Sequence, residues 1–244
     1  MKFLYIIYQW LIAYPIILVA TLLTAISTTL GSILGFSRWW GYYPPMLWSK
    51  LFCRLMFVSV TVTGRENIDH KTSYLFVSNH QGAYDIFCIY GYLYHDFKWM
   101  MKASLQHIPF VGYACKRAGH IFVDRSSPKR LLHTIELAQQ TLSGGMSLVV
   151  FPEGARTYTG KMRAFKRGAF KLATDFKLPL VPLTINGSFE VLPRTSYQIT
   201  PGKITLTIHP PIYPNYDSNK IDLDPIMKEC YGQIQSALEQ KNKD

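Results

Sequence analysis

Residues 74–85 have the sequence YLFVSNHQGAYD, which passes from an apolar run through a polar turn into residues at helical spacing. The run from Tyr74 to Ser78 predicts a buried strand, because it is short, apolar and partly aromatic. Gly82 marks the turn, since glycine adopts positive φ without steric cost. The stretch therefore predicts a strand that ends just before His80. It also predicts a helix with Asp85 in or near its first turn, where the helix dipole favours a carboxylate.

His80 and Asp85 are five residues apart, and a tight turn can bring side chains at that spacing within hydrogen-bond distance. The carboxylate would then fix the tautomer of the imidazole and stabilise the imidazolium that forms on proton uptake. A base without a serine of its own suggests that the substrate supplies the hydroxyl group. The alternative is a structural histidine beside a helix-capping aspartate. For this pair taken alone, the alternative is favoured.

From Val58 onward, short apolar runs alternate with helical patterns. Strands that alternate with helices predict an α/β layer fold in which a mostly parallel sheet is flanked by helices. The expected strands are residues 58–63, 74–78, 98–101, 120–123, 147–151, 180–185 and 204–208. Helices are expected at residues 128–142, with Ser126 or Ser127 as N-cap, and at residues 165–176 and 224–241.

Polar residues come directly after four of these strands: His80, Lys102, Asp124-Arg125 and Glu153-Gly154. The carboxyl ends of parallel strands share one edge of a sheet, and functional residues gather there. Arg125 offers a planar fork that suits a phosphate monoester, or it pairs with Asp124 on the surface. Lys102 supplies a second positive charge, or it is a solvated loop lysine.

Three blocks follow the His80 stretch in order: GHIFVDR at 119–125, FPEGART at 151–157 and VPLT at 181–184. Together with residues 79–85 they resemble the blocks of the glycerolipid acyltransferase family, and within it most closely those of bacterial 1-acyl-sn-glycerol-3-phosphate acyltransferases. The blocks extend from Asn79 to Thr184, nearly half of the chain. Four ordered blocks are far more specific than any one of them.

This resemblance implies transfer of an acyl chain from acyl-ACP or acyl-CoA to the sn-2 hydroxyl of lysophosphatidic acid, giving phosphatidic acid. His80 would be the general base and Asp85 would orient it, with neither an acyl-enzyme nor a metal or cofactor. The residues that would bind the substrate fall into two groups. Lys102, Arg125 and Arg156 would hold the phosphate, and Glu153 and Gly154 would contact the glycerol backbone.

The sequence departs from the family pattern at two positions. The family often has serine where Gly82 stands, and serine or threonine where Ala155 stands. Each departure removes a hydroxyl group that could contact the head group. The identity of the head group therefore stays open, and an O-acyltransferase for another lyso-lipid, such as a lyso-aminolipid, is one alternative. A second alternative, independent of these departures, is a non-catalytic membrane lipid-binding protein.

The net charge of +11, from 26 Lys+Arg and 15 Asp+Glu, predicts an anionic partner. The apolar N-terminus favours membrane lipid over nucleic acid. A basic cluster is either a solvated face or a surface that attracts acyl carrier protein or anionic head groups; it comprises Lys161, Arg163, Lys166, Arg167 and Lys171. The four cysteines lack a C-x-x-C spacing, which predicts a reducing compartment. The chain has no G-x-S-x-G motif of a serine hydrolase.

No charged residue occurs between Lys2 and Arg38. One helix of that length would measure about 50 Å, against about 30 Å of bilayer hydrocarbon. Either one helix spans the membrane, from about Trp10 to Leu30, or two helices form a hairpin broken near residues 31–35. Aromatic residues and then basic ones follow, and this order places the main domain on the cytoplasmic side of the inner membrane.

Residues 44 and 45 are both proline and are expected to stop any preceding helix. An amphipathic helix is expected from Met46 to Phe57, which either lies on the bilayer or packs on the domain. The expected organisation is a membrane-anchoring segment of helices at residues 1–57 and a catalytic α/β domain at residues 58–244.

Overall fold

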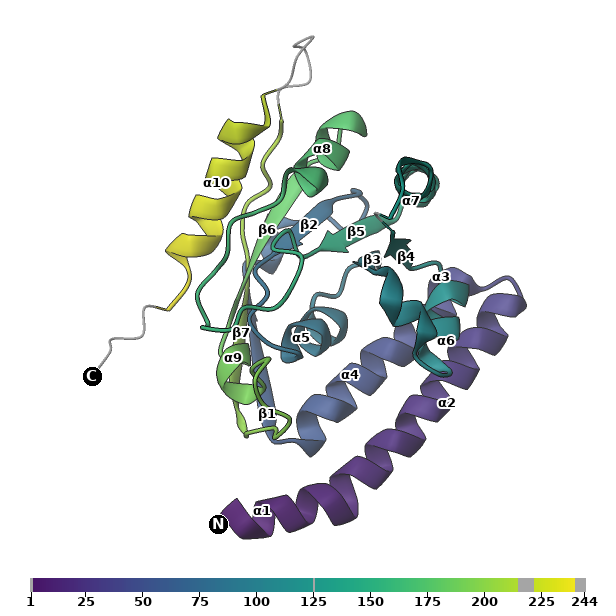
Figure 1. Cartoon of the computed structure of the whole chain (residues 1–244), viewed down its shortest axis with the longest axis vertical. Helices are drawn as coiled ribbons and strands as arrows, with labels where there is room; N and C mark the ends of the chain where they lie inside the picture. Colours follow the sequence, from purple (N-terminus) through teal and green to yellow (C-terminus); the bar gives the residue numbers. More distant parts are fainter. Residues whose placement is uncertain (1, 125, 215–221, 240–244) are drawn as a thin grey trace.

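A twisted sheet lies at the centre of the computed structural model, which describes residues 2–124, 126–214 and 222–239 (Figure 1). The described residues form seven strands in the order β1-β7-β6-β2-β5-β3-β4. Their bounds are β1 Val58–Thr63, β2 Leu75–Ser78, β3 Phe97–Lys102, β4 Ile121–Val123, β5 Ser147–Val150, β6 Leu180–Asn186 and β7 Gly202–Ile208. The α/β architecture expected from the alternation of strands and helices is confirmed.

The five strands from β6 to β4 are mutually parallel. β7 pairs antiparallel with β6, and β1 pairs parallel with β7. The sheet is therefore mostly parallel, as expected. Its two central strands, β2 and β6, are buried along their whole length, as strands covered by helices on both faces must be.

Helices cover both faces of the sheet (Figure 1). One apolar core lies under α4 (Tyr43–Leu55) and α5 (Tyr84–Tyr92). The other core lies under α7 (Pro128–Ser143), α8 (Arg167–Asp175) and α10 (Leu223–Ser236). The remaining short helices are α3 (Ser37–Trp40), α6 (Val111–Arg117) and α9 (Ser188–Val191).

A single long helix begins at Lys2 and runs through α1 (Lys2–Tyr8), a π-helical turn (Gln9–Ala13) and α2 (Tyr14–Ile33). The π turn directly precedes Pro15, whose missing N–H interrupts the α-helical ladder. After Gly35, which has φ of 92°, α3 and α4 lead the chain back along α2. The apolar stretch thus forms one long helix followed by a hairpin-like return.

Several element bounds differ from the expected ones. α4 begins at Tyr43, with both prolines in its first turn, where a missing N–H leaves no hydrogen bond unmade. α8 begins at Arg167 because Lys166 is still extended and donates its N–H to the carbonyl of Pro152. α10 ends at Ser236, and the expected end of this helix at Lys241 lies outside the described residues. The N-cap of α7 is Ser127, which was one of the two residues expected at that position.

Candidate active site

The sheet order places the candidate residues in one row. His80 follows β2, Glu153 follows β5, Lys102 ends β3 and Asp124 follows β4, and these four strands are consecutive in the sheet. Neighbouring strands lie about 4.8 Å apart, so the strand ends that carry His80 and Lys102 are roughly 10 Å apart. The strands thus bring a histidine, two carboxylates and the cation of Lys102 to a single edge. Arg125, the expected phosphate ligand in this row, lies outside the described residues.

The side chains of His80 and Asp85 form a hydrogen-bonded pair. Nδ1 of His80 lies 2.8 Å from Oδ2 of Asp85. Asp85 is buried, and the His80 side chain is 13% exposed. Because Nδ1 faces the carboxylate, Nε2 is the ring nitrogen left to meet a substrate. The turn after β2 therefore produces a histidine with a fixed tautomer and one accessible nitrogen.

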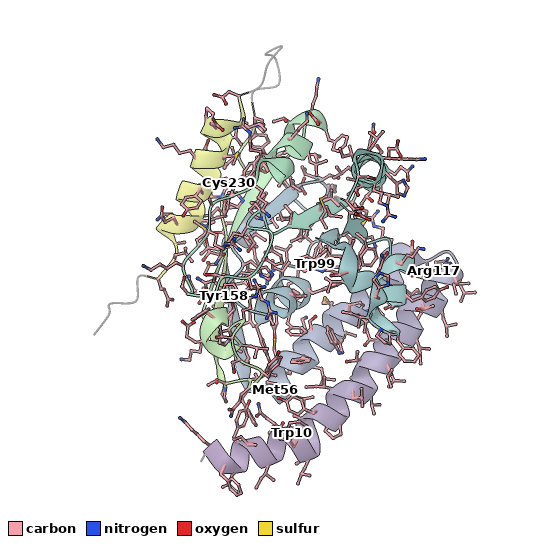
Figure 2. All side chains as sticks on the ribbon, viewed as in Figure 1. Trp10, Met56, Trp99, Arg117, Tyr158 and Cys230 are labelled. Atoms are coloured by element: carbon pink, nitrogen blue, oxygen red, sulfur yellow. The ribbon has the colours of Figure 1, made fainter. Side chains whose placement is uncertain are left out.

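An aromatic ring supports the imidazole from one side. The ring of Phe151 lies parallel to that of His80, with centroids 3.9 Å apart and an interplanar angle of 8°. Trp99 of β3 stacks on Phe151 in turn, with ring centroids 5.6 Å apart (Figure 2). In the sequence, Phe151 is the last residue of an expected strand and the first residue of the FPEGART block. The signal was an aromatic residue at the end of β5, the strand that pairs with β2.

Glu153 joins the His80 turn to the loop that follows β5. Its Oε1 accepts the backbone N–H of His80 at 2.8 Å, and its Oε2 accepts the backbone N–H of Arg163 at 2.9 Å. Burial raises the pKa of this carboxyl group, while the two N–H donors oppose that shift. The N–H of Thr157 in turn donates to the carbonyl of His80 at 3.0 Å. The loop is thus tied to the histidine by hydrogen bonds in both directions.

Several cations surround this loop. Arg156 is half-buried, and its carbonyl accepts a hydrogen bond from the guanidinium of Arg194 at 3.3 Å. Arg194 also lies 4.3 Å above the ring of Tyr158. Gly154 has φ of 76°, and a Cβ at this position would lie 2.7 Å from Nζ of Lys166. Arg194 and Lys166 therefore add positive charge near Arg156, and neither was among the site residues expected from the sequence.

The carboxylate of Asp124 pairs with Arg130 at 2.7 Å and accepts the N–H of Ser126 at 2.9 Å. The Arg130 hydrogen bond, together with those from Ser126, lowers the pKa of Asp124 to about 2. The alternative to phosphate binding by Arg125 was a surface ion pair between Arg125 and this aspartate. The described residues already provide a guanidinium partner for Asp124.

Gly82 has no room for the serine that the family often carries. A Cβ at Gly82 would lie 2.3 Å from the carbonyl oxygen of Ser188. The N–H of Gly82 donates to Oδ2 of Asp85 at 3.0 Å. This departure from the family pattern therefore has a local steric reason and leaves the His80–Asp85 pair intact.

Two other histidines are buried and structural. The ring of His120 accepts the N–H of Trp99 at Nδ1 and contacts the hydroxyl of Tyr90 at Nε2. Burial lowers the pKa of His120 to about 3 and that of His95 to about 4. Both rings are therefore neutral at physiological pH, and both lie away from the row of candidate residues.

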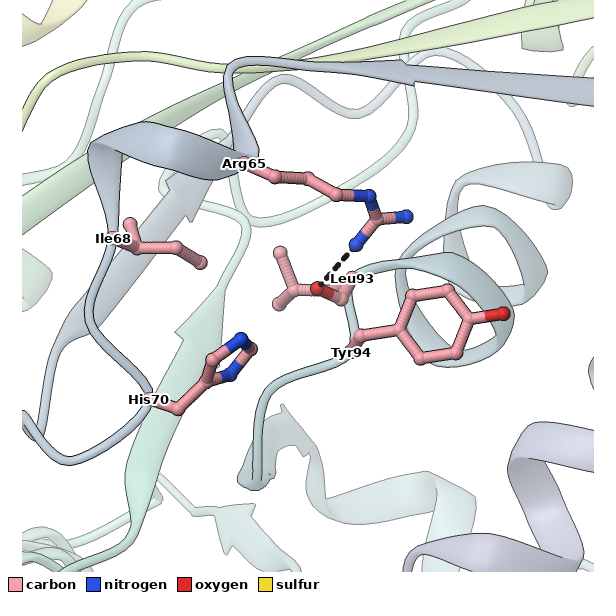
Figure 3. Close-up of a pocket in the computed structure, with 5 residues that line it drawn as sticks. All are labelled: Arg65, Ile68, His70, Leu93 and Tyr94. Carbon is pink, nitrogen blue, oxygen red and sulfur yellow. Dashed lines mark hydrogen bonds between the residues drawn. The ribbon is translucent and has the colours of Figure 1, made fainter.

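A hollow of about 250 Å³ lies at the opposite end of the sheet, beside the C-terminus of α5 (Figure 3). Arg65 is one of the residues that line this hollow. Its guanidinium donates to the carbonyls of Tyr92 and Leu93 and lies over the ring of Tyr94. These bonds satisfy carbonyls that the end of α5 leaves free. Arg65 thus acts as a helix cap, and the hollow holds none of the candidate residues.

Comparisons with known proteins agree with this geometry. A family model described as acyltransferase matches residues 59–186. A 1-acyl-sn-glycerol-3-phosphate acyltransferase from Chlamydomonas reinhardtii is 31% identical over 167 residues, which cover 68% of this chain and 50% of that protein. A protein of the same name from Saccharomyces cerevisiae is 36% identical over 141 residues, covering 56% of this chain and 46% of that one. The chain spans about half the length of the curated relatives it matches.

A solved structure matches nearly the whole chain. The crystal structure of the 1-acyl-sn-glycerophosphate acyltransferase from Thermotoga maritima superposes with a TM-score of 0.70 at 26% identity. The match covers 90% of this chain and 93% of that one.

Proposed function

Because the chain belongs to the acyltransferase family, we propose that it transfers an acyl chain from an acyl thioester to the sn-2 hydroxyl of lysophosphatidic acid. The product would be phosphatidic acid. One observation carries this proposal: His80 is paired through Nδ1 with the buried Asp85 and stands in a row of strand ends that also holds Lys102. The relatives named 1-acyl-sn-glycerol-3-phosphate acyltransferases support the choice of acceptor.

The proposed reaction uses the acceptor hydroxyl as the nucleophile. Nε2 of His80 takes the proton of this hydroxyl while its oxygen attacks the thioester carbonyl. The tetrahedral intermediate collapses with loss of the thiolate, which takes the proton back from the imidazolium. Asp85 stabilises the imidazolium between these two steps. Phe151, stacked on the ring, keeps Nε2 directed toward the acceptor.

We propose that the phosphate monoester lies over the strand ends next to His80, where Lys102, Arg125 and Arg156 hold it. Gly154 and Glu153 border the place of the glycerol backbone. Glu153 shapes that place through the two backbone N–H groups it binds. The acyl donor would be acyl-ACP or acyl-CoA. Lys161 and Lys166, which form no ion pair with the described residues, would attract either anionic donor.

A direct assay tests this function. The purified full-length protein is mixed in detergent with lysophosphatidic acid and either acyl-CoA or acyl-ACP, and products are identified by mass spectrometry. We expect phosphatidic acid with at least one donor. Acylation of a lyso-aminolipid but not of lysophosphatidic acid would identify another acceptor. No acylated product with any of these acceptors would indicate a non-catalytic lipid-binding protein.

We propose that residues 1–57 anchor the protein and residues 58–244 form the catalytic domain. The long N-terminal helix is apolar enough to cross a membrane, yet it lies along α4 and packs against α6 of the domain. Near its start, the hydroxyl of Tyr8 donates to the carbonyl of Leu55 at 3.0 Å, and the amide of Gln9 donates to that of Ile199 at 2.9 Å. Farther along, the indole of Trp48 donates to Thr21 at 2.9 Å.

The long helix carries large apolar side chains that are exposed, and Trp10 is one of them, at 69% exposed (labelled in Figure 2). This exposed apolar face comprises Phe3, Leu4, Trp10, Leu11, Leu18, Val19, Leu23, Ile26, Leu30 and Ile33. A helix fixed to a domain along most of its length favours insertion of this face into one leaflet over a free-standing span. By the positive-inside argument, the leaflet would be the cytoplasmic one of the inner membrane.

A single charge on this face is expected to weaken membrane binding. Leu18 on α2 is 62% exposed, and Leu132 on α7, on the other side of the sheet, is 57% exposed. Leu18→Glu should reduce partitioning onto anionic lipid vesicles on the order of tenfold, because a carboxylate is costly to insert among acyl chains. Vesicle flotation of both variants measures this. Equal flotation of Leu18→Glu and Leu132→Glu would rule out this face as the docking surface.

A further inference from the structure

Ser188 lies directly after β6, the strand that pairs with β2 on the side opposite β5. It is fully buried. It thus extends the row of strand-end residues by one strand, next to the turn that carries His80 and Asp85. In the sequence Ser188 is the third residue of Asn186-Gly187-Ser188, which matches a glycosylation sequon and gives no sign of this placement. In the fold the amide of Asn186 is bonded to the end of α10, with Nδ2 donating to the carbonyl of Ala237 at 2.8 Å.

The hydroxyl of Ser188 donates a hydrogen bond to Oδ1 of Asp85. The other oxygen, Oδ2, accepts from Nδ1 of His80 at 2.8 Å and from the N–H of Gly82 at 3.0 Å. Three donors therefore surround one buried carboxylate. Bonds to both oxygens prevent the carboxylate from rotating about its Cβ–Cγ bond, and that rotation would break the contact to the imidazole.

We propose that Ser188 is a positioning residue for acyl transfer. Its hydroxyl holds the Asp85 carboxylate in the orientation in which Oδ2 meets Nδ1 of His80, so that Nε2 faces the acceptor hydroxyl. The proposal rests on the proposed function of the His80–Asp85 pair. It also assigns Ser188 a part that the spacing of the family blocks does not reveal.

The geometry separates this serine from the nucleophile of a serine hydrolase. In a hydrolase triad the serine hydroxyl bonds to the imidazole nitrogen that faces away from the aspartate. Here the hydroxyl bonds to the aspartate itself, on the oxygen that does not meet the histidine. The Ser188 hydroxyl is fully buried and bonded to the aspartate, so it is not placed as a nucleophile that would form an acyl-serine.

The backbone around Ser188 is fixed from both sides. Gly187 has φ of 86°, and a Cβ there would lie 2.1 Å from the carbonyl of Lys203 in β7. On the other side, the N–H of Ala83 donates to the carbonyl of Leu192 at 3.2 Å, and Gly82 forms a β-bridge with Pro193. The segment after β6 and the His80 turn are thus held together, and Ser188 stays in register with Asp85.

The first test is a kinetic comparison of buried-serine variants. Ser188→Ala leaves Oδ1 of Asp85 without its donor, so kcat should fall roughly ten- to hundredfold, while both Michaelis constants change little. Ser188→Thr keeps the hydroxyl group and should restore most of the rate. Ser147→Ala is the matched control. Its equally buried hydroxyl accepts the N–H of Tyr74 and bonds to His95 at the other end of the sheet, so its loss should leave kcat unchanged.

The second test asks whether the effect passes through Asp85. In an Asp85→Ala background the hydroxyl has no carboxylate to hold, so adding Ser188→Ala should cause little further loss. An equal loss in both backgrounds would overturn the proposal, as would a wild-type kcat in Ser188→Ala.

A spectroscopic test separates this proposal from the proposed function. The Nδ1–H proton resonance of His80, identified by its loss in His80→Ala, should shift in Ser188→Ala and not in Ser147→Ala. If the wild-type protein acylates no lysophosphatidic acid, the proposed function fails, and this resonance still decides the place of Ser188. An unchanged resonance in Ser188→Ala would overturn the positioning assignment.

Discussion

His80→Ala is expected to lower the turnover of lysophosphatidic acid on the order of 10⁴-fold, because it removes the base that takes the proton of the acceptor hydroxyl. Asp85→Asn should retain more activity, with a rate roughly 10- to 100-fold above that of His80→Ala. The amide can keep an acceptor oxygen toward Nδ1 of His80 and turn its NH₂ toward the hydroxyl of Ser188. The geometry survives, and the negative charge that stabilises the imidazolium is lost.

Steady-state kinetics of both variants measures which of them retains the higher turnover rate. Flotation checks that both variants still bind the membrane. The buried His95 is the matched control residue, because it lies at the opposite end of the sheet and contacts Ser147. His95→Gln should leave kcat unchanged even where it lowers the melting temperature. A His80→Ala enzyme close to the wild-type rate would refute base catalysis. An acyl-protein trapped by rapid quench would refute direct transfer.

The row of strand ends was predictable from the sequence because parallel strands share an edge. The apolar runs before His80, Lys102, Asp124 and Glu153 set their positions, and the sheet confirms that the four strands are neighbours. The family resemblance drawn from the four blocks is confirmed by the match over residues 59–186.

The contacts around the pair were not predictable, because they join segments distant in the sequence. Phe151 stacks on a ring 71 positions earlier, and Ser188 bonds to a carboxylate 103 positions earlier. No periodicity or local spacing encodes such contacts. They follow from the strand order, in which β5 and β6 flank β2. The partner of Asp124 was also missed, since Arg130 and Arg125 are equally plausible on sequence.

The N-terminal helix shows the same limit. The charge-free run predicted its length and apolar character, and composition alone left a span and a hairpin equally open. Its placement depends on a few polar groups within the run, such as the side chains of Tyr8 and Gln9. Tyr8 bonds to a carbonyl of α4 and Gln9 to a carbonyl of the domain, and the mean hydropathy of the run does not reveal such contacts.

Loss of an arginine that we propose to bind the phosphate is expected to raise the Michaelis constant for lysophosphatidic acid by roughly 10- to 100-fold, since a hydrogen bond between charged groups contributes about 1.5–3 kcal/mol. Arg156, half-buried beside the Glu153 loop, and Arg125, which follows β4 in the sequence, are the residues to test. Arg125→Lys keeps the charge and loses the planar fork, so it should have a smaller effect than Arg125→Ala.

The control is Arg167→Ala, which removes an exposed guanidinium of α8 that is paired with Asp224 at 2.7 Å. We expect Arg125→Ala and Arg156→Ala to leave the constant for the acyl donor nearly unchanged, because the donor thioester carries no phosphate monoester at the reacting end. Arg167→Ala should change neither constant. A lyso-lipid without a phosphate should lose nothing when either arginine is replaced, because it never made the contact. If the wild-type protein uses such an acceptor with the same efficiency as lysophosphatidic acid, the arginines are structural. The lyso-aminolipid alternative then replaces the proposed substrate.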